Sequence, residues 1–287
     1  MIASSELILN ADGSVFHLHL LPEQLADKVI LVGDQNRVPL VASFFDSVEC
    51  DVQNREFRTI TGMYKGKRIS AVSTGIGTDN CDIVITELDA LVNVDFATRE
   101  VKKQLKKLTF VRIGTSGGLQ PECDLGSFVV SEKSLGFDGL LNFYADKDKV
   151  NEADFVEAFK EHTHWAAHHN EPYVVSADAA LVDQIAKDDM IRGVTISANG
   201  FYGPQGREVR LKLADPKLNE NIESFEYNGH RITNFEMESS AIAGLSAMLG
   251  HRAMTVCCII ANRLAKKANV NYQEAIKALI KKVLDRI

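Results

Sequence analysis

Short apolar runs rich in β-branched residues alternate along the chain with segments whose apolar residues recur every three or four positions. The apolar runs predict largely buried strands over residues 28–33, 68–74, 108–114, 127–132, 193–198, 231–236 and 254–260. The amphipathic segments predict helices over residues 82–91, 178–188, 238–249 and 272–284. Because strand and helix alternate, the pattern favours an α/β layered fold with a mixed sheet.

The whole chain, residues 1–287, is expected to form a single domain, since no flexible linker, low-complexity tract or internal repeat interrupts the pattern. The charged stretch 146–169 is interpreted as a helical excursion on the surface. His164 and His168 would then face one way at i and i+4. Two imidazoles without a further ligand favour a solvated helix face over a zinc site, and no metal is expected.

Composition and charge exclude several kinds of partner. The chain has 39 acidic against 32 basic residues and a net charge of −7. The charges are spread along the whole sequence, so no basic face is expected for nucleic acid or an anionic membrane. The five cysteines show neither disulfide nor metal spacing, and no apolar stretch approaches a membrane span of about 20 residues. We therefore expect a soluble, cytoplasmic protein with reduced cysteines.

Three predicted strands are followed by glycine-containing turns, where an α/β sheet normally places its ligand site. These turns cover residues 33–37, 74–77 and 112–118, and the first and third each carry an arginine. Exposed backbone N–H groups and guanidinium forks both suit a phosphate. One such turn alone is more often a tight connection, but together they indicate a phosphate pocket.

The order of the short motifs is more specific than any one of them. The chain reads Val15-Phe16-His17-Leu18, Gly33-Asp34-x-x-Arg37-Val38, Asn54-Arg55-Glu56-Phe57, Ser73-Thr74-Gly75-Ile76-Gly77, Arg112-Ile113-Gly114-Thr115-Ser116-Gly117, Phe201-Tyr202-Gly203-Pro204-Gln205-Gly206-Arg207, Phe235-Glu236-Met237-Glu238-Ser239-Ser240 and Asn262-Arg263-Leu264. This order resembles the uridine phosphorylases of the nucleoside phosphorylase family over nearly the whole chain. The resemblance implies an α/β/α sandwich around a twisted mixed sheet, with active sites completed across a dimer interface. A hexamer of three dimers is the bacterial precedent.

The resemblance also implies site residues and a reaction. The expected residues are Gly33, Arg37, Arg55, Arg112 and Thr115 for phosphate, His17, Met237 and Glu238 for ribose, and Phe201, Gln205, Arg207 and Arg263 for the base. His17 and Arg55 would be lent to the neighbouring subunit. The catalytic candidates are Arg112, Arg207, Gln205 and Glu238. The expected reaction is phosphorolysis of uridine to uracil and ribose 1-phosphate in pyrimidine salvage, with inorganic phosphate as co-substrate and no cofactor. Deoxyuridine and thymidine are left open as further substrates.

The chemistry of the base segment agrees with this expectation. Uracil presents an acceptor, a donor and a second acceptor; a glutamine amide supplies a donor and an acceptor, and an arginine adds donors. Gln205 and Arg207 fit that edge, whereas the 4-amino group of cytosine would face donors. Residues 201–207 could instead form only an exposed turn without a binding role. This alternative is disfavoured because the segment lies between motifs that match the family.

Other functions stay open on the residues alone. Purine-specific relatives carry a Ser-Asp pair after the last core strand, where this chain reads Ile260-Ala261-Asn262-Arg263. A hydrolytic nucleosidase would have little use for the phosphate arginines. A nucleoside-binding protein without activity would be expected to lose some of those arginines or Glu238, and here all are retained. Glu236 and Glu238 could instead merely stabilise the N-terminus of a helix.

The chain also departs from the family pattern in places. Gln35 stands where proline is usual, and residues 78–80 read Thr-Asp-Asn where bacterial members commonly have Gly-Pro-Ser. Bacterial relatives may hold a monovalent cation at the dimer interface; Glu56 and Ile76 match its ligands, but Asn80 replaces the serine, so no such ion is expected. Extra residues at 93–106 and the excursion near Asp146 look closer to the eukaryotic type.

Overall fold

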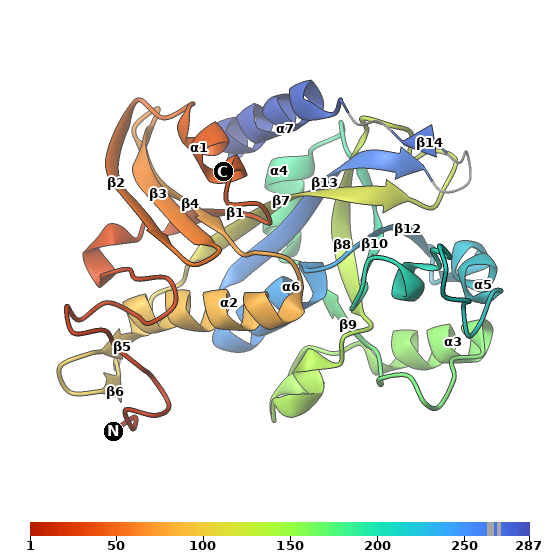
Figure 1. The fold of residues 1–287 in the computed structure, drawn as a ribbon, viewed down its shortest axis with the longest axis horizontal. Helices are drawn as coiled ribbons and strands as arrows, with labels where there is room; N and C mark the ends of the chain where they lie inside the picture. The colour runs from red at the N-terminus through yellow and green to blue at the C-terminus, as the bar shows by residue number, and fades with distance from the viewer. Residues whose placement is uncertain (263–266, 269–270) are drawn as a thin grey trace.

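A mixed β-sheet runs through the molecule and is covered by helices on both faces (Figure 1). The structure is a computed structural model that describes residues 1–262, 267–268 and 271–287. The strands of the main sheet are β1 (Lys28–Val32), β2 (Ser47–Asn54), β3 (Phe57–Tyr64), β4 (Lys67–Ser73), β7 (Thr109–Gly118), β8 (Phe128–Gly136), β9 (Tyr173–Ser176), β10 (Ile191–Ser197), β11 (Glu226–Tyr227), β12 (His230–Glu236), β13 (Arg252–Asn262) and β14 (Lys267–Ala268). A separate small pair consists of β5 (Val94–Asp95) and β6 (Glu100–Val101).

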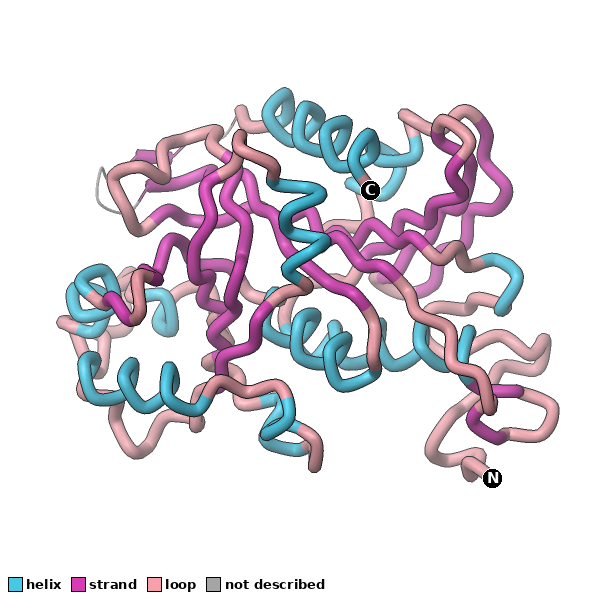
Figure 2. Tube along the Cα trace, turned by 180° about the vertical axis from the view of Figure 1, so that it is seen from behind, coloured by secondary structure: helices cyan, strands magenta, loops and turns pink. Residues whose placement is uncertain are grey.

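The helices form the outer layers. The α-helices are α1 (Arg37–Ala42), α2 (Thr78–Asn93), α3 (Ala153–Thr163), α4 (Ala179–Ala186), α5 (Leu218–Ser224), α6 (Ser239–Leu249) and α7 (Gln273–Arg286). Short 3-10 turns are η1 (Pro22–Gln24), η2 (Leu140–Phe143), η3 (Lys147–Lys149) and η4 (Gly203–Gln205). Helices α1, α4 and α7 share one apolar core with the sheet, and α2 and α6 share another. Figure 2 shows the same layers from behind. The expected α/β/α sandwich around a mixed sheet is confirmed.

The strand order brings several strand ends to one edge. Within the described residues it is β11-β12-β10-β8-β13-β7-β1-β4-β3-β2. Strand β1 pairs in parallel with β4 and β7, and β7 pairs in parallel with β13. Strand β12 also pairs antiparallel with the end of β7. This extra pairing closes β12, β10, β8, β13 and β7 into a ring, while β1, β4, β3 and β2 stay open.

Each predicted strand and helix has a counterpart in the structure, whereas one region differs from the expectation. Residues 146–169 do contain a helix, α3, which buries Phe155 and Phe159 in a third apolar cluster with β10 and β12. The helix ends at Thr163, because His164 adopts a left-handed conformation with φ of 52°. His164 and His168 therefore do not share a helix face, and that interpretation was wrong.

Cysteines, possible metal-binding groups and helix lengths are three further features of the structure. All five cysteines are free, and only Cys50 is not fully buried. Among the described residues, no group of three or more His, Cys, Asp or Glu side chains is placed to hold a metal ion. In the same part of the chain, none of the helices has the length and apolar character that crossing a bilayer requires.

The closing contact between β7 and β12 depends on glycine. A Cβ atom at Gly118 would lie 2.7 Å from the Cys123 carbonyl oxygen, which is closer than real Cβ contacts come. We predict that Gly118→Ala lowers the free energy of unfolding by about 1–3 kcal/mol, because the backbone must shift to admit the methyl group. Urea unfolding at a fixed protein concentration measures this change. The matched control is Gly203→Ala, where the added Cβ meets no atom within 4 Å; equal stability of the two variants would contradict the prediction.

Candidate active site

A cavity of about 910 Å³ opens at the edge where β1, β4 and β7 end. The three glycine-containing turns that follow these strands form one part of its wall. The loop after β10 and the segment between β12 and α6 form the rest. The cavity therefore lies where the carboxyl ends of parallel strands meet, the usual ligand site of an α/β sheet.

One part of the cavity wall carries two arginines. Gly33, Arg37, Arg112 and Thr115 all line it. Arg37 begins α1, and its Nη1 donates to the carbonyl of Ile113 at 3.4 Å. Partial burial lowers the pKa of Arg37. A half-buried cation beside glycine-containing turns favours an oxyanion here.

Arg112 is bound by two buried carboxylates. Its Nη1 lies 2.8 Å from Oε2 of Glu236, and its Nη2 donates to Oε2 of Glu238. All three side chains are almost fully buried. Burial alone would lower the pKa of Arg112, but the charges of Glu236 and Glu238 outweigh burial and raise it. The guanidinium is thus fixed in its charged form at the cavity wall.

The two carboxylates, Glu236 and Glu238, accept hydrogen bonds from different groups. Glu236 accepts the backbone N–H groups of Glu238 and Ser239 at 2.9 to 3.0 Å, so the alternative of stabilising the helix start is correct for this residue. Glu238 instead accepts the N–H of Gly77 at 2.7 Å and the guanidinium of Arg112. Burial and the charge of Glu236 raise the pKa of Glu238 in spite of the neighbouring cation. Glu238 and Met237 both line the cavity.

Another part of the cavity wall carries an amide beside a guanidinium. Phe201, Gln205 and Arg207 line it. The Arg207 guanidinium carbon lies 3.8 Å from the centre of the Phe201 ring, and Nη1 donates to Oε1 of Gln205 at 2.6 Å. Gly206 between them has φ of 65°, and a Cβ there would lie 2.3 Å from the Asn219 amide. The turn therefore orients the buried Gln205 amide and keeps Arg207 next to it.

His17 and Arg55 do not line this cavity. Nδ1 of His17 lies 2.6 Å from Oε1 of Glu87 on α2. The Asn54 side chain donates to the His17 carbonyl at 2.8 Å, and the Arg55 guanidinium lies 5.4 Å from the centre of the Phe16 ring. The two residues thus belong to one neighbouring surface, outside the cavity of their own chain. The remaining expected residue, Arg263, lies outside the described residues.

Two residues that line the cavity, Glu236 and Tyr272, are not among those expected from the sequence to bind substrate. Glu236 was considered only as a helix-stabilising carboxylate, although its place two residues before Glu238 at a strand end was a usable signal. Tyr272, which immediately precedes α7, also lines the cavity. No motif marks Tyr272 in the sequence.

The structure also shows which groups lie near Glu56, where bacterial relatives may hold a monovalent cation. The side-chain Nδ2 of Asn80 donates to the Ile76 carbonyl at 3.2 Å. An amide donor therefore faces the carbonyl oxygen that a monovalent cation would need as a ligand. The residues at this position do not fit such an ion.

The partly rolled sheet and the glycine-containing turns at its edge define an α/β protein with a cavity lined by arginines, carboxylates and amides. The chain belongs to the phosphorylase superfamily, whose family model matches residues 27–287. It is 30% identical to a uridine phosphorylase of Thermococcus kodakarensis over 96% of this chain and 90% of that protein. It is also 30% identical to a uridine phosphorylase of Escherichia coli, over 87% of this chain and 86% of that protein.

Solved structures agree with this assignment. A nucleoside phosphorylase of Trypanosoma brucei, described as showing uridine phosphorylase activity, is 29% identical and superposes with a TM-score of 0.89 over 98% of both chains. A uridine phosphorylase of the oomycete Phytophthora capsici shares the fold, with a TM-score of 0.75 at 23% identity over 99% of this chain and 97% of the other.

The Arg112 cluster makes a prediction about stability. Both oxygens of Glu236 accept hydrogen bonds: Oε1 from Ser197 and Ser239, and Oε2 from Arg112 and the backbone of Glu238. In Glu236→Gln the amide group faces donors whichever way it is turned, so we expect a loss of about 1–3 kcal/mol in the free energy of unfolding.

Urea unfolding measures this loss against Glu226→Gln, which makes the same change on an exposed residue. Equal midpoints for the two variants would show that the buried acceptor is dispensable.

Proposed function

We propose that this protein cleaves uridine with inorganic phosphate, giving uracil and ribose 1-phosphate. The observation that carries the proposal is one cavity lined both by Arg37 and Arg112 and by the Gln205–Arg207 pair. Its volume of about 910 Å³ lies in the range of small-molecule sites and admits a nucleoside together with phosphate. Membership of the phosphorylase superfamily and the similarity to uridine phosphorylases support the same reaction.

Phosphate would bind beside Arg37 and Arg112. Gly33 and Thr115 supply polar groups of the turns, and Arg37 and Arg112 supply charge. A phosphate oxygen that receives a hydrogen bond from Arg112 competes with Glu238 for the same guanidinium. The carboxylate of Glu238 would then turn to the ribose hydroxyls, next to Met237. Binding of phosphate therefore prepares the ribose subsite.

The reaction requires stabilisation of charge at both ends of the breaking bond. The glycosidic bond between C1′ and N1 breaks with its electron pair going to uracil, while an oxygen of hydrogen phosphate forms the new bond to C1′. The proton of the hydrogen phosphate ends on N1, so that the products are uracil and ribose 1-phosphate. The ribosyl centre gains positive character, which the phosphate dianion stabilises. The departing base gains negative charge over its carbonyl oxygens, and Arg207 and Gln205 stabilise that charge. The reaction uses phosphate as co-substrate and needs no other cofactor.

A purine substrate is less well supported. Purine-specific relatives would need a carboxylate after the last core strand, and that part of the wall holds Ile260 and Ala261. The next residue, Asn262, is buried and its amide donates to the Cys123 carbonyl at 2.9 Å. The Asn262 amide therefore binds a carbonyl of the protein rather than a base.

The complete site would belong to a dimer. His17 and Arg55 lie outside their own cavity but on one surface, which suits their donation to a second copy. We propose a homodimer as the smallest active unit, and a hexamer of three dimers is compatible with it. A cytoplasmic role in pyrimidine salvage, without nucleic-acid or membrane partners, completes the proposal.

Removal of Arg207 tests the base subsite. We predict that Arg207→Ala lowers kcat/KM for uridine by about 100- to 1,000-fold, because a donor to the developing negative charge is lost. Steady-state kinetics at saturating phosphate measures the effect. Arg210→Ala is the matched control, since Arg210 lies on the same loop but does not line this cavity. Equal kinetics for the two variants would remove Arg207 from the mechanism.

Mixing two inactive variants tests the shared site. In a mixed dimer of Arg55→Ala and Arg207→Ala, one site carries both defects and the other carries neither. Random reassociation makes about half of the dimers mixed, so activity should return to about a quarter of the wild-type value. The assay compares uracil release before and after the variants are unfolded together and refolded. Activity that stays at the level of the separate variants would mean that each chain builds its site alone.

A further inference from the structure

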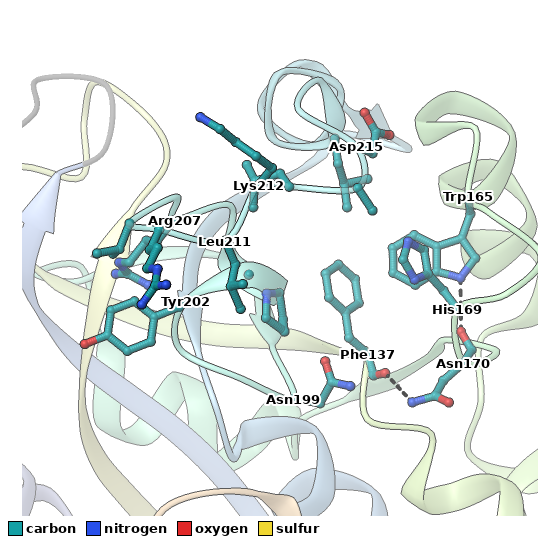
Figure 3. Close-up of a pocket in the computed structure, with 17 residues that line it drawn as sticks. Phe137, Trp165, His169, Asn170, Asn199, Tyr202, Arg207, Leu211, Lys212 and Asp215 are labelled. Atoms are coloured by element: carbon teal, nitrogen blue, oxygen red, sulfur yellow. Dashed lines mark hydrogen bonds between the residues drawn. The ribbon is translucent and has the colours of Figure 1, made fainter.

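A second cavity, of about 690 Å³, lies on the other side of the loop that carries Gln205 and Arg207. In Figure 3, Trp165 and His169 stand on one side, Tyr202, Arg207 and Leu211 on the other, and the Phe137 ring lies between them. The proposed reaction uses none of these side chains except Arg207. This cavity is therefore separate from the active-site cavity, although Arg207 lines both.

One side of this cavity is a fixed aromatic surface. The ring of Trp165 lies 4.6 Å from Phe137 and 4.8 Å from His169, measured between ring centres. The indole N–H of Trp165 donates to the Asn170 carbonyl at 3.0 Å, and the Asn170 amide donates to the Phe137 carbonyl at 3.2 Å. Because the polar edge of the indole is satisfied inside the protein, its rings can serve as an apolar surface for a planar ligand.

The opposite side is cationic. Arg207, Arg210 and Lys212 line the cavity together with a single carboxylate, that of Asp215. Lys212 pairs with Glu208 at 2.6 Å, whereas Arg210 forms no ion pair with any residue that the structure describes. An excess of positive charge beside an aromatic surface suits a ring that carries an acidic group.

We propose that this cavity binds a small aromatic anion, and that its occupation changes the base subsite of the active site. Tyr202, Gly203 and Pro204 face the second cavity, while Phe201 and Gln205 face the first. Arg207 lines both. A ligand packed against the short turn η4 therefore acts on the residues that hold the base. Binding stands independently of the proposed reaction, and only its kinetic effect rests on that reaction.

Trp165 makes the binding directly measurable. It is the only tryptophan of the chain. The probe is 8-anilinonaphthalene-1-sulfonate, an aromatic anion whose emission is excited by energy transfer from tryptophan. We expect saturable binding at one site per chain that persists when uracil and phosphate, at saturating concentration, occupy the active site. Displacement of the probe by uracil and phosphate would assign it to the active site and overturn the proposal.

A charge reversal localises the probe. Arg210→Glu should weaken its binding by about five- to tenfold, because an attractive charge becomes a repulsive one at an exposed position. Lys103→Glu makes the same reversal on an exposed residue that lines neither cavity, and it should leave binding unchanged. Equal affinity for the two variants would overturn the proposal even if both turn over uridine normally.

Competition identifies the class of natural ligand. With uracil and phosphate still present, uridine 5′-monophosphate and benzoate are titrated against the bound probe. Displacement by the nucleotide alone indicates a ring with a distant phosphate, and displacement by benzoate indicates a simple aromatic acid. Displacement by neither would contradict the assignment. The probe should also change the KM for uridine by about twofold or more while leaving that for phosphate unaltered; an unchanged uridine KM at full occupancy would disprove the coupling.

Discussion

A buried arginine held between two buried carboxylates is the interaction on which the site depends. Arg112 comes from β7, whereas Glu236 ends β12 and Glu238 immediately precedes α6. A lone charge at such a position would cost several kcal/mol, so each of the three is tolerated only because the others are present. The cluster joins the rolled part of the sheet to a covering helix and at the same time forms the wall of the cavity.

The same cluster underlies the proposed binding of phosphate and ribose. With Arg112 occupied by Glu238, the cation and the carboxylate compensate each other inside the protein. In the proposed reaction, an incoming oxyanion would offer Arg112 a new partner, and the released Glu238 carboxylate would accept hydrogen bonds from hydroxyl groups. Arg207 donates to Gln205 and lies over the Phe201 ring, so the proposed base subsite is also organised in advance.

Much of the fold could be predicted from the sequence, because strands buried on both faces leave continuous apolar runs that β1, β4, β7, β8, β10, β12 and β13 all show. The hairpin of β2 and β3 was not predicted, since β2 is largely exposed and mixes polar with apolar residues. The left-handed residue His164, which ends α3, carries no signal in residue type. Most of the residues that the motifs name line one cavity, but His17 and Arg55 do not, and Arg263 lies outside the described residues. The ion pair of Arg112 with Glu238 joins positions 126 residues apart and needed the structure.

The central claim is that one cavity brings an oxyanion and a pyrimidine nucleoside together. The measurement that tests it most directly is base release from uridine, cytidine and inosine, each with and without phosphate. Uridine with phosphate should give uracil and ribose 1-phosphate, and cytidine should react about 10- to 100-fold more slowly, because its amino group faces donors. Without phosphate no base should appear. Faster release from inosine than from uridine, or release of uracil without phosphate, would contradict the account.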